Sequence, residues 1–276
     1  MSTIDIYAVP AFDDNYLWVL STAEPDPRSG KRFAYVVDPG DATVILETLE
    51  YNKMQLKGIL TTHHHFDHVG GIAELVDQYN VSVYGPEIDH IPHQTRTLQD
   101  GERLKLAGIK CECEVMFVPG HTKGHIAYYF KTGLEHPALF CGDTLFAGGC
   151  GRLLGGTADQ LFESLEKIKQ LDPETRIYCA HEYTVSNLRF AVAVEPGNPM
   201  LQHRLLNTQA ARDRGEPTVP SRLQDELNTN PFLRCDQPEV IAAATARMPD
   251  YGDDPASVFM ILRKWKDVFV PAPTTD

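Results

Sequence analysis

Four histidines and one aspartate fall within six consecutive positions in the segment HHHFDH, directly after the apolar stretch KGIL. In an extended chain alternate side chains share a face, so His63 and His65 can present imidazoles to one cation while His64 points away. Asp67 and His68 enter the following turn and project in a different direction. The spacing therefore predicts part of two adjacent metal sites, each needing further nitrogen and oxygen ligands.

Three later polar residues follow apolar runs and are candidates for the missing ligands. They are His121 in VPGHTKGH, Asp143 in FCGDTLF and His181 in CAHEYT. A lone histidine at a strand end is more often a surface or hydrogen-bonding residue, and a histidine tract can also bind metal adventitiously. The aspartate interleaved at fixed spacing, with apolar patterns on both sides, favours a metal site. His125 is expected to lie behind the ligands or at a strand start.

The elements that must position these residues alternate strands with helices. Apolar runs predict strands in IDIYAVP, NYLWVLST, FAYVVDPG, KGILTT and VSVYGP, and a hairpin in ERLKLAGIKCECEVMFVPGH. HIAYYF, ALFCGDTLF and RIYCAHEYT are further strands. Helical spacing predicts helices in DATVILETL and HVGGIAELVDQYN, so the histidine motif joins a strand to a helix. Asp38 and Asp41 are expected as turn and helix-cap residues.

Thr157 and Gln160 form a capping-box signature before the helix ADQLFESLEKIKQL.

The apolar pattern of the chain changes near residue 182. Beyond residue 183 every apolar segment has helical spacing, in TVSNLRFAVAVE, NPMLQHRLLNTQAARDRG, SRLQDEL, PEVIAAATARM and DPASVFMILRKWKDVF. We therefore expect an α/β metal-binding domain over residues 1–182 and a small helical domain over residues 183–276.

Composition excludes several classes of protein. The 276 residues are 42% hydrophobic and 23% charged, as in an ordinary globular protein, and the formal charge of -13 disfavours binding to nucleic acid or anionic membranes. The amino-terminal segment lacks a basic region followed by an apolar run, which predicts a cytoplasmic protein. The six cysteines are scattered without a CxxC pair, so we expect reduced, buried thiols.

Motifs along the whole chain resemble one family. The THxHxDH segment, the later GH, CGDT and AHEYT resemble the metallo-β-lactamase superfamily, and AFDDNY, VVDPGD, GCGRL, NPFLR and the basic last helix narrow the resemblance to glyoxalase II, the hydroxyacylglutathione hydrolases. The resemblance implies an αββα sandwich followed by a small all-α carboxyl-terminal domain. It also implies two divalent metal ions, the first bound by His63, His65 and His121, the second by Asp67, His68 and His181, with Asp143 bridging them.

The implied substrate is a glutathione thioester, an anion that needs a local basic site on an acidic protein. The resemblance implies contacts from Arg152, Tyr183, Arg263 and Lys266. The basic residues of the last helix could instead form a solvated face that favours the helix carboxyl terminus. Leu154 departs from the family pattern, because some members carry tyrosine or phenylalanine there, so we expect altered substrate affinity.

The implied reaction is hydrolysis of S-D-lactoylglutathione and related 2-hydroxyacyl thioesters to D-lactate and glutathione, in methylglyoxal detoxification. Two metal ions can share a water and lower its pKa towards ~7, so hydroxide is the expected nucleophile and no Ser or Cys is required. Asp67 is a possible proton acceptor. We expect zinc, with iron or manganese as acceptable alternatives for the same donors, and a monomeric enzyme.

Four alternatives use similar residues. A β-lactamase or lactonase would share the metal site but lacks a helical domain with a basic end. A persulfide dioxygenase would use a single iron with fewer ligands. A nuclease is disfavoured by the charge of -13 and the absence of a broad basic stripe. A metal-storage protein would show no turnover of the thioester. Phe66, between the ligands His65 and Asp67, is expected to pack as structure.

Overall fold

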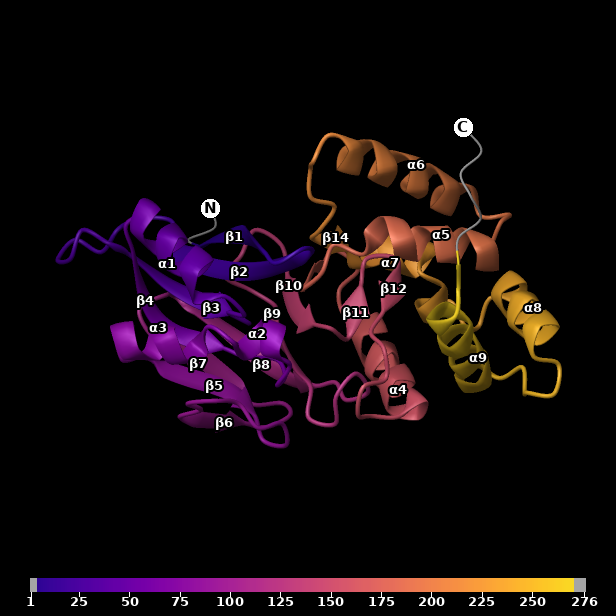
Figure 1. The fold of residues 1–276 in the computed structure, drawn as a ribbon, viewed down its shortest axis with the longest axis horizontal. Helices are drawn as coiled ribbons and strands as arrows, with labels where there is room; N and C mark the ends of the chain where they lie inside the picture. The colour runs from indigo at the N-terminus through magenta and orange to yellow at the C-terminus, as the bar shows by residue number, and fades with distance from the viewer. Residues whose placement is uncertain (1–3, 271–276) are drawn as a thin grey trace.

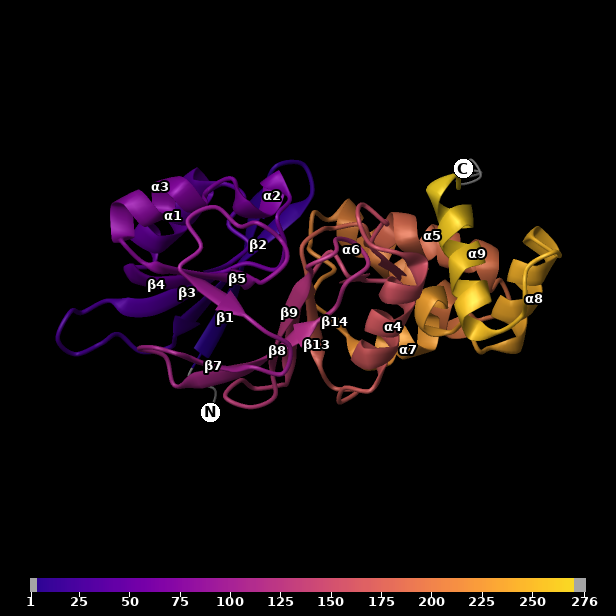
Figure 2. The same cartoon turned by 90° about the horizontal axis from the view of Figure 1, so that it is seen from below.

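The computed structural model of the protein describes residues 4–270, which form two facing six-stranded sheets with helices outside them (Figures 1 and 2). The first sheet has the spatial order β1 (Ile4–Ala11), β2 (Asn15–Thr22), β3 (Arg32–Val37), β4 (Met54–Leu60), β5 (Ser82–Pro86) and β6 (Arg96–Leu98). The second has the order β14 (Ser221–Arg222), β13 (Arg176–Cys179), β10 (Ala138–Gly142), β9 (Ile126–Phe130), β8 (Cys111–Phe117) and β7 (Arg103–Leu106).

The strand β2 shows why the sheets stack in this way. Its seven residues from Asn15 to Ser21 are buried, as in a strand covered on both faces. Trp18 and Leu20 contribute to the core between the sheets, whereas Leu17 and Val19 face the core beneath the helices α1 (Ala42–Tyr51) and α3 (Ile72–Tyr79). Alternation along one strand therefore supplies two cores, and the predicted αββα class is confirmed.

The helices that follow the second sheet close the other side of the molecule. α4 (Ala158–Lys169) begins with the predicted capping box, in which Thr157 Oγ1 accepts from the Gln160 backbone N–H and the Gln160 side chain accepts from the Thr157 backbone N–H. The remaining helices extend from this side (Figure 2). They are α5 (Thr184–Val194), α6 (Pro199–Asp213), α7 (Leu223–Thr229), the 3-10 turn Pro231–Leu233, α8 (Pro238–Arg247) and α9 (Pro255–Asp267).

Two predicted elements differ from the structure, and one strand was not predicted. The helix expected over HVGGIAELVDQYN is broken into α2 (Phe66–Val69) and α3, because Gly70 and Gly71 touch the backbone of the Gly40 loop: a Cβ on Gly71 would lie 2.5 Å from the Ala42 backbone nitrogen. The strand expected over ALFCGDTLF ends at Gly142, and Leu145–Phe146 forms a separate ribbon, β11, with β12 (Gly149–Cys150). The strand β6 was not predicted.

The predicted all-helical carboxyl-terminal region contains one strand. Ser221–Arg222, expected at the start of a helix, pairs with β13 as the strand β14, and α7 begins only at Leu223. Backbone pairing at the sheet edge therefore overrides the local helical spacing. The ends of both predicted domains, residues 1–3 and 271–276, lie outside the described residues. Within residues 4–270 no helix is long and apolar enough to cross a membrane.

The six cysteines are all buried and free of disulfides, as predicted. Burial raises the thiol pKa of each of them, to about 12 for Cys179 and well above the ordinary value for Cys141. Protonated, inaccessible thiols behave as small apolar core residues. None of the six therefore supplies a nucleophile or a thiolate ligand.

Candidate active site

The candidate ligands meet where several strands end or begin at one edge of the sandwich. His63 follows β4, Asp143 follows β10 and His181 follows β13. Backbone hydrogen bonds tie the two sheets together there: the Ile126 N–H donates to the Thr62 carbonyl at 3.0 Å and the Tyr16 N–H to the Ala180 carbonyl at 2.7 Å. Loops anchored at both ends by strands provide a rigid frame for a metal centre.

The first predicted group is brought together in the structure. His65 Nδ1 lies 3.0 Å from His63 Nε2 and 3.0 Å from His121 Nε2. All three residues converge on one point from two separate loops. Donors bound tetrahedrally at about 2.0–2.1 Å from zinc lie about 3.3 Å apart, so these spacings are close to those of a bound group.

The second predicted group lies beside the first. Asp67 Oδ2 is 3.3 Å from Nε2 of His68 and 3.3 Å from Nε2 of His181. These three side chains lie close enough together to bind a second metal ion. His68 is fully buried, and its Nε2 has no hydrogen-bond partner among the described residues. A buried nitrogen without a partner is costly, which is the signature expected where a cation completes the site.

Asp143 faces both groups with different oxygens. Its Oδ2 lies 3.4 Å from His121 Nε2 in the first group, while its Oδ1 lies 3.4 Å from Nε2 of both His68 and His181 in the second. Oδ1 is buried and has no hydrogen-bond partner among residues 4–270. The carboxylate is therefore placed between the two groups, as a bridging ligand would be.

The imidazoles are held from behind through their Nδ1 atoms. His121 Nδ1 lies 2.8 Å from the Arg152 carbonyl, which can only accept, so this nitrogen carries the proton and leaves the Nε2 lone pair for a metal. His68 Nδ1 lies 3.1 Å from Asp38, and His181 Nδ1 lies 2.8 Å from Asp14. Such outer partners fix the tautomer and the ring orientation of a metal ligand.

Asp38 is the outer partner that the sequence interpretation underestimated. Its carboxylate accepts from the Thr62 backbone N–H and from Thr62 Oγ1, both at 2.7 Å, and Thr62 Oγ1 lies 3.0 Å from His63 Nδ1. Asp38, His63 and His68 could also hold a cation. Because the Asp38 oxygens are already engaged, the carboxylate acts as an anchor for both histidines. Asp41 is the predicted cap and accepts from the Thr43 N–H at 2.8 Å.

The sequence did not predict that Asp14 and Asn15 contact metal ligands, although both lie in the noted segment AFDDNY. Asn15 Nδ2 donates to Asp67 Oδ2 at 3.0 Å, so this turn supports one ligand directly and His181 through Asp14. The only available signal was a pair of acidic residues at the end of a predicted strand, since the partners are more than 50 residues away in the chain.

The pKa shifts divide the ligands into two sets. Burial, helped by the neighbouring histidines, lowers the pKa of His63 well below its ordinary value and also lowers that of His65. Burial would lower the pKa of His68 and His181 as well, but Asp143 with the other carboxylates raises these to about 10 and about 11. A cation at the second group therefore has to displace protons, as metal binding to histidine commonly does.

His125 and His64 lie outside both groups. His125 is buried, its Nε2 accepts from the Asp143 backbone N–H at 3.2 Å, and its ring stacks on His63 with centroids 4.6 Å apart. This is the predicted supporting position. His64 turns away to Asp89, with its Nδ1 2.9 Å from Asp89 Oδ2. Phe66 is 74% exposed, so the prediction that it packs as structure is wrong: the turn into α2 directs its ring outward.

A cavity of about 470 Å³ extends from the metal ligands to α9. The four residues implied as substrate contacts all line it, together with two of the metal ligands. The full lining is His121, Asp143, Phe146, Cys150, Arg152, Leu154, Tyr183, Ser186, Asn187, Arg263, Lys266, Asp267 and Phe269. The cavity joins one end of the metal centre to a basic wall. A cavity of this size is typical of small-molecule sites.

The basic wall is held by hydrogen bonds of its own. Arg263 is only 3% exposed and its Nη1 donates to the carbonyls of Cys150 at 2.9 Å and Gly151 at 3.2 Å. Lys266 Nζ donates to the Ser186 carbonyl at 3.0 Å. Burial and the nearby Arg263 lower the pKa of Lys266 to about 8. Two partly desolvated cations side by side would be stabilised by an anionic ligand.

Tyr183 and Leu154 form other parts of the cavity. Tyr183 stacks on the His181 ring with centroids 4.8 Å apart and an interplanar angle of 3°. Burial, with Asp14 and Asp143, raises the pKa of the Tyr183 hydroxyl, which keeps it a hydrogen-bond donor. Leu154 is 57% exposed, so its side chain offers the cavity an apolar surface and no hydrogen bond.

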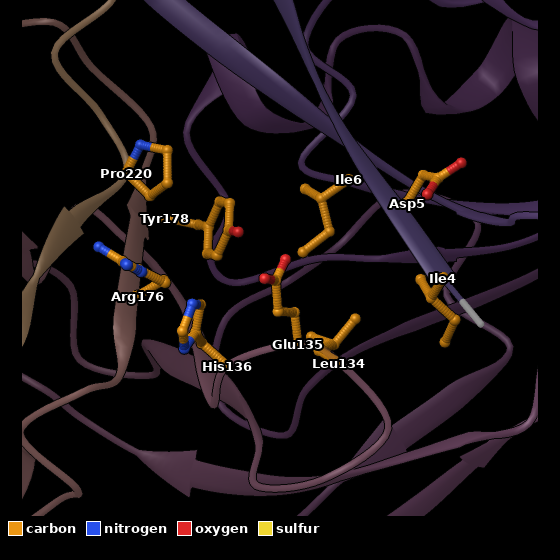
Figure 3. A pocket seen from close by; sticks show the side chains of 9 residues that line it. All are labelled: Ile4, Asp5, Ile6, Leu134, Glu135, His136, Arg176, Tyr178 and Pro220. Atoms are coloured by element: carbon orange, nitrogen blue, oxygen red, sulfur yellow. The ribbon is translucent and has the colours of Figure 1, made fainter. Parts of the chain in front are cut away.

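A second cavity, of about 360 Å³, lies near the first residues of β1 and β13, whereas His181 follows the last residue of β13. Figure 3 shows the side chains that line it. It is lined by Ile4, Asp5, Ile6, Leu134, Glu135, His136, Arg176, Tyr178 and Pro220. None of the predicted site residues lines it. It is therefore separate from the candidate active site.

Two family models match consecutive parts of the chain. Residues 28–181 match the model of the metallo-beta-lactamase superfamily, and residues 182–269 match the model described as hydroxyacylglutathione hydrolase C-terminus. Among solved structures, ETHE1 from Myxococcus xanthus superposes with a TM-score of 0.60 at 17% identity, covering 95% of this chain and 97% of that chain. BLEG-1 B3 metallo-beta-lactamase gives a TM-score of 0.60 at 22% identity, covering 83% and 99%. These similarities show the fold.

A solved structure with higher sequence identity, TTHA1623, is in a di-iron-bound form. It has a TM-score of 0.52 and 30% identity, and the match covers 63% of this chain and 91% of that chain. Because our chain presents two adjacent sets of histidine and aspartate donors, the residues present here fit divalent metal ions.

Hydroxyacylglutathione hydrolases from several bacteria match nearly the whole chain. Hydroxyacylglutathione hydrolase of Nitrosomonas europaea is 45% identical over 266 residues, covering 96% of this chain and 97% of its own. The hydroxyacylglutathione hydrolase of Pseudomonas aeruginosa is 48% identical over 267 residues, covering 96% and 100%. That of Alkalilimnicola ehrlichii is 48% identical over 263 residues, covering 95% and 98%. The chain therefore belongs to the hydroxyacylglutathione hydrolase family, glyoxalase II, within the metallo-β-lactamase superfamily.

Proposed function

We propose that the protein hydrolyses S-D-lactoylglutathione and related S-2-hydroxyacylglutathiones to D-lactate and glutathione, the thioester step of methylglyoxal detoxification. The observation that carries the proposal is the position of Asp143, whose two oxygens lie 3.4 Å from ligands of different groups while its side chain also lines the basic cavity. This position supports a metal centre at the end of a site for an anionic thiol.

The proposed ligand sets are His63, His65 and His121 for the first metal ion and Asp67, His68 and His181 for the second, bridged by Asp143. Two divalent cations bound there would supply hydroxide at neutral pH and polarise the thioester carbonyl. We propose zinc as the metal in use, with iron or manganese accepted by the same nitrogen and oxygen donors. Asp38, Asp14 and the Arg152 carbonyl would hold the ligand histidines in place through their Nδ1 atoms.

Asp67 is proposed as the proton acceptor of the reaction. Burial would raise its pKa, but the neighbouring imidazoles of His181 and His68 and a hydrogen bond from Asn15 lower it, so the carboxylate is ionised at neutral pH. Its side chain is 37% exposed, so a proton taken up there can pass to solvent. The glutathione thiolate, with a thiol pKa near ~8.5, leaves without a dedicated acid.

The glutathione half is proposed to lie in the cavity against Arg152, Tyr183, Arg263 and Lys266. Arg263 is largely engaged with the Cys150 and Gly151 carbonyls, so its charge and its hold on this loop support binding. Lys266 and Arg152 are better placed to meet a carboxylate, because Lys266 is only partly buried and Arg152 is exposed. We further propose that the protein acts as a monomer in the cytoplasm, because its cysteines are free thiols and the cytoplasm keeps thiols reduced.

The test is hydrolysis of S-D-lactoylglutathione, followed by loss of the thioester absorbance, with metal analysis on the same sample. We expect turnover together with two bound metal ions per chain. A fully metallated preparation without turnover would rule out the substrate while leaving the metal centre intact. Parallel assays with a β-lactam and a lactone distinguish the two other hydrolase activities of this fold.

A further inference from the structure

Asp89 is a buried carboxylate beside the metal centre that belongs to neither ligand group. It lies in the loop between β5 and β6 and is 5% exposed. Its Oδ2 accepts from Thr122 Oγ1 at 2.6 Å, and its Oδ1 accepts from the Gly124 backbone N–H at 2.9 Å. Thr122 directly follows the ligand His121. The carboxylate therefore anchors the turn that presents this ligand.

The contact between Asp89 and this turn is tight. A Cβ on Gly124 would lie 2.5 Å from the Asp89 backbone nitrogen and 2.5 Å from its Oδ1, so a glycine is needed for the approach. Thr122 is fully buried, and its carbonyl accepts from the Gly120 N–H at 2.9 Å. The 152–154 loop also holds His121, through the Arg152 carbonyl at His121 Nδ1 and the Leu154 N–H at the His121 carbonyl. Asp89 is the buried carboxylate that fixes the far side of this turn, at Thr122 and Gly124.

The same carboxylate holds the middle histidine of the HHH tract. His64 Nδ1 lies 2.9 Å from Asp89 Oδ2. The His64 ring is otherwise close to the first metal group, with its centroid 4.9 Å from that of His65, and its side chain is 43% exposed. An imidazole so near and so accessible is a competing ligand unless another group holds it.

We propose that Asp89 is a positioning residue for the first metal group: it fixes the turn that carries His121 and withdraws His64, so that only His63 and His65 of the tract bind the metal. This inference rests on the binuclear centre proposed above. Within residues 4–270 the hydrogen bonds and ion pairs of Asp89 reach Thr122, Gly124 and His64 and none of the second group. Loss of Asp89 should therefore affect one ion selectively.

The experiment compares full-length wild-type protein with Asp89→Ala, Asp89→Asn and the control Glu87→Ala, an exposed acid in the same loop. Each protein is stripped with a chelator and titrated with Zn²⁺ against a chromophoric competitor, and a second sample is titrated with Co²⁺ and followed by its absorption spectrum. In Asp89→Ala we expect one ion to bind about 10- to 100-fold more weakly and the other to bind as in the wild type. Glu87→Ala should match the wild type.

The remaining variants separate positioning from folding. Asp89→Asn keeps an acceptor for Gly124 and should give an intermediate affinity. Thr122→Val removes one hydrogen bond with little change in shape and should weaken the same ion, so the test survives if Asp89→Ala does not fold. In the Asp89→Ala background, His64→Ala should return the Co²⁺ spectrum towards that of the wild type.

The results separate failure of the role proposed for Asp89 from failure of the binuclear centre. Wild-type affinity for both ions in Asp89→Asn and Thr122→Val would overturn the positioning role of Asp89, as would equal weakening of both ions. An unchanged spectrum on adding His64→Ala would overturn the withdrawal of His64. If the wild type itself bound no second ion, the binuclear centre would be wrong instead.

Discussion

Each ligand histidine of the candidate centre except His65 is fixed by a partner behind it. The Nδ1 atom of His63 lies within hydrogen-bond distance of Thr62, that of His68 of Asp38, and that of His121 of the Arg152 carbonyl. These contacts set the direction of the free nitrogens before any metal arrives, which lowers the free energy needed to organise the site on binding.

Replacement of Asp143 tests the bridging ligand. Asp143→Ala should lower both metal content and activity, with kcat/KM falling by more than about 100-fold, because the carboxylate faces both groups. Metal analysis and steady-state kinetics on one preparation measure the two effects. Asp77→Ala, an exposed acid on α3, is the control. Full occupancy of both sites in Asp143→Ala would contradict bridging.

Replacement of Asp14 tests an outer partner without a large cost in stability. The carboxylate is 38% exposed and its Oδ1 lies 2.8 Å from His181 Nδ1. Asp14→Ala should weaken binding of the second ion by about 10- to 100-fold and leave the melting temperature nearly unchanged. The neighbouring exposed Asp13→Ala is a matched control. Equal Zn²⁺ affinities for the two variants would show that His181 needs no anchor.

At the scale of elements, α9 brings positive charge to the cavity of an acidic protein. Lys266 lies partly buried on this helix with a pKa lowered to about 8, so it is charged below that pH and neutral above it. We expect KM for the thioester to rise as the pH increases from 7 through 9, because the anionic substrate loses a cationic partner. Steady-state kinetics across this pH range measure the effect.

A pair of variants assigns this pH dependence to one side chain. Lys266→Ala should raise KM at pH 7 by about 10-fold and flatten its pH dependence, while kcat changes little. Lys264→Ala, an exposed lysine on the same helix that contacts Tyr251, should behave like the wild type. An unaltered KM profile in Lys266→Ala would place the substrate elsewhere.

The glycine break between α2 and α3 is a second feature at this scale. Gly71 lies against the loop before α1, where a Cβ would come 2.5 Å from the Ala42 backbone nitrogen and 2.7 Å from the Pro39 carbonyl oxygen. Gly71→Ala should therefore lower the free energy of unfolding by about 1–3 kcal/mol and displace α2, which carries Asp67 and His68. Denaturant unfolding and metal content are the measurements. Gly155→Ala, where a Cβ meets only ordinary contacts, should cost far less.

At the scale of the whole molecule, one hydrophobic core runs through both predicted domains. Val115, Tyr128 and Phe140 of the second sheet belong to the same cluster as Phe190 and Phe259 of the carboxyl-terminal helices. The regions are also joined by polar contacts: the buried Glu226 accepts from the Gly148 N–H at 2.7 Å, and Asn230 donates to the Gly149 carbonyl at 2.9 Å. We propose that the boundary near residue 182 separates roles rather than folding units.

This continuity predicts cooperative unfolding. The full chain should melt in a single calorimetric transition, and Phe259→Ala should lower the stability of the whole molecule by about 3–5 kcal/mol because it opens the shared core. Calorimetry and near-ultraviolet circular dichroism measure this. Two separate transitions, with only one shifted by Phe259→Ala, would show that the helical region is an independent folding unit.

Local sequence patterns predict much of the architecture and the residues of the two ligand groups. Strand periodicity gave NYLWVLST the bounds that β2 has, and the histidine motif, with His121, Asp143 and His181 at strand ends, contained every residue of the two groups. Local patterns suffice here because side-chain alternation and turn chemistry depend on neighbours in the chain. Propensity also misplaced elements, as in Ser221–Arg222, where pairing with β13 prevails.

The partners of the ligand histidines become evident only in the folded chain. Asp14 holds His181 across 167 positions, Asp38 anchors His68, and Asp89 takes His64 away from its two neighbours in the tract. Each of these is an acidic residue in a turn, and no local pattern identifies the histidine that it contacts. Their roles arise because folding places loops from distant strands within hydrogen-bond distance, which spacing along the chain does not encode.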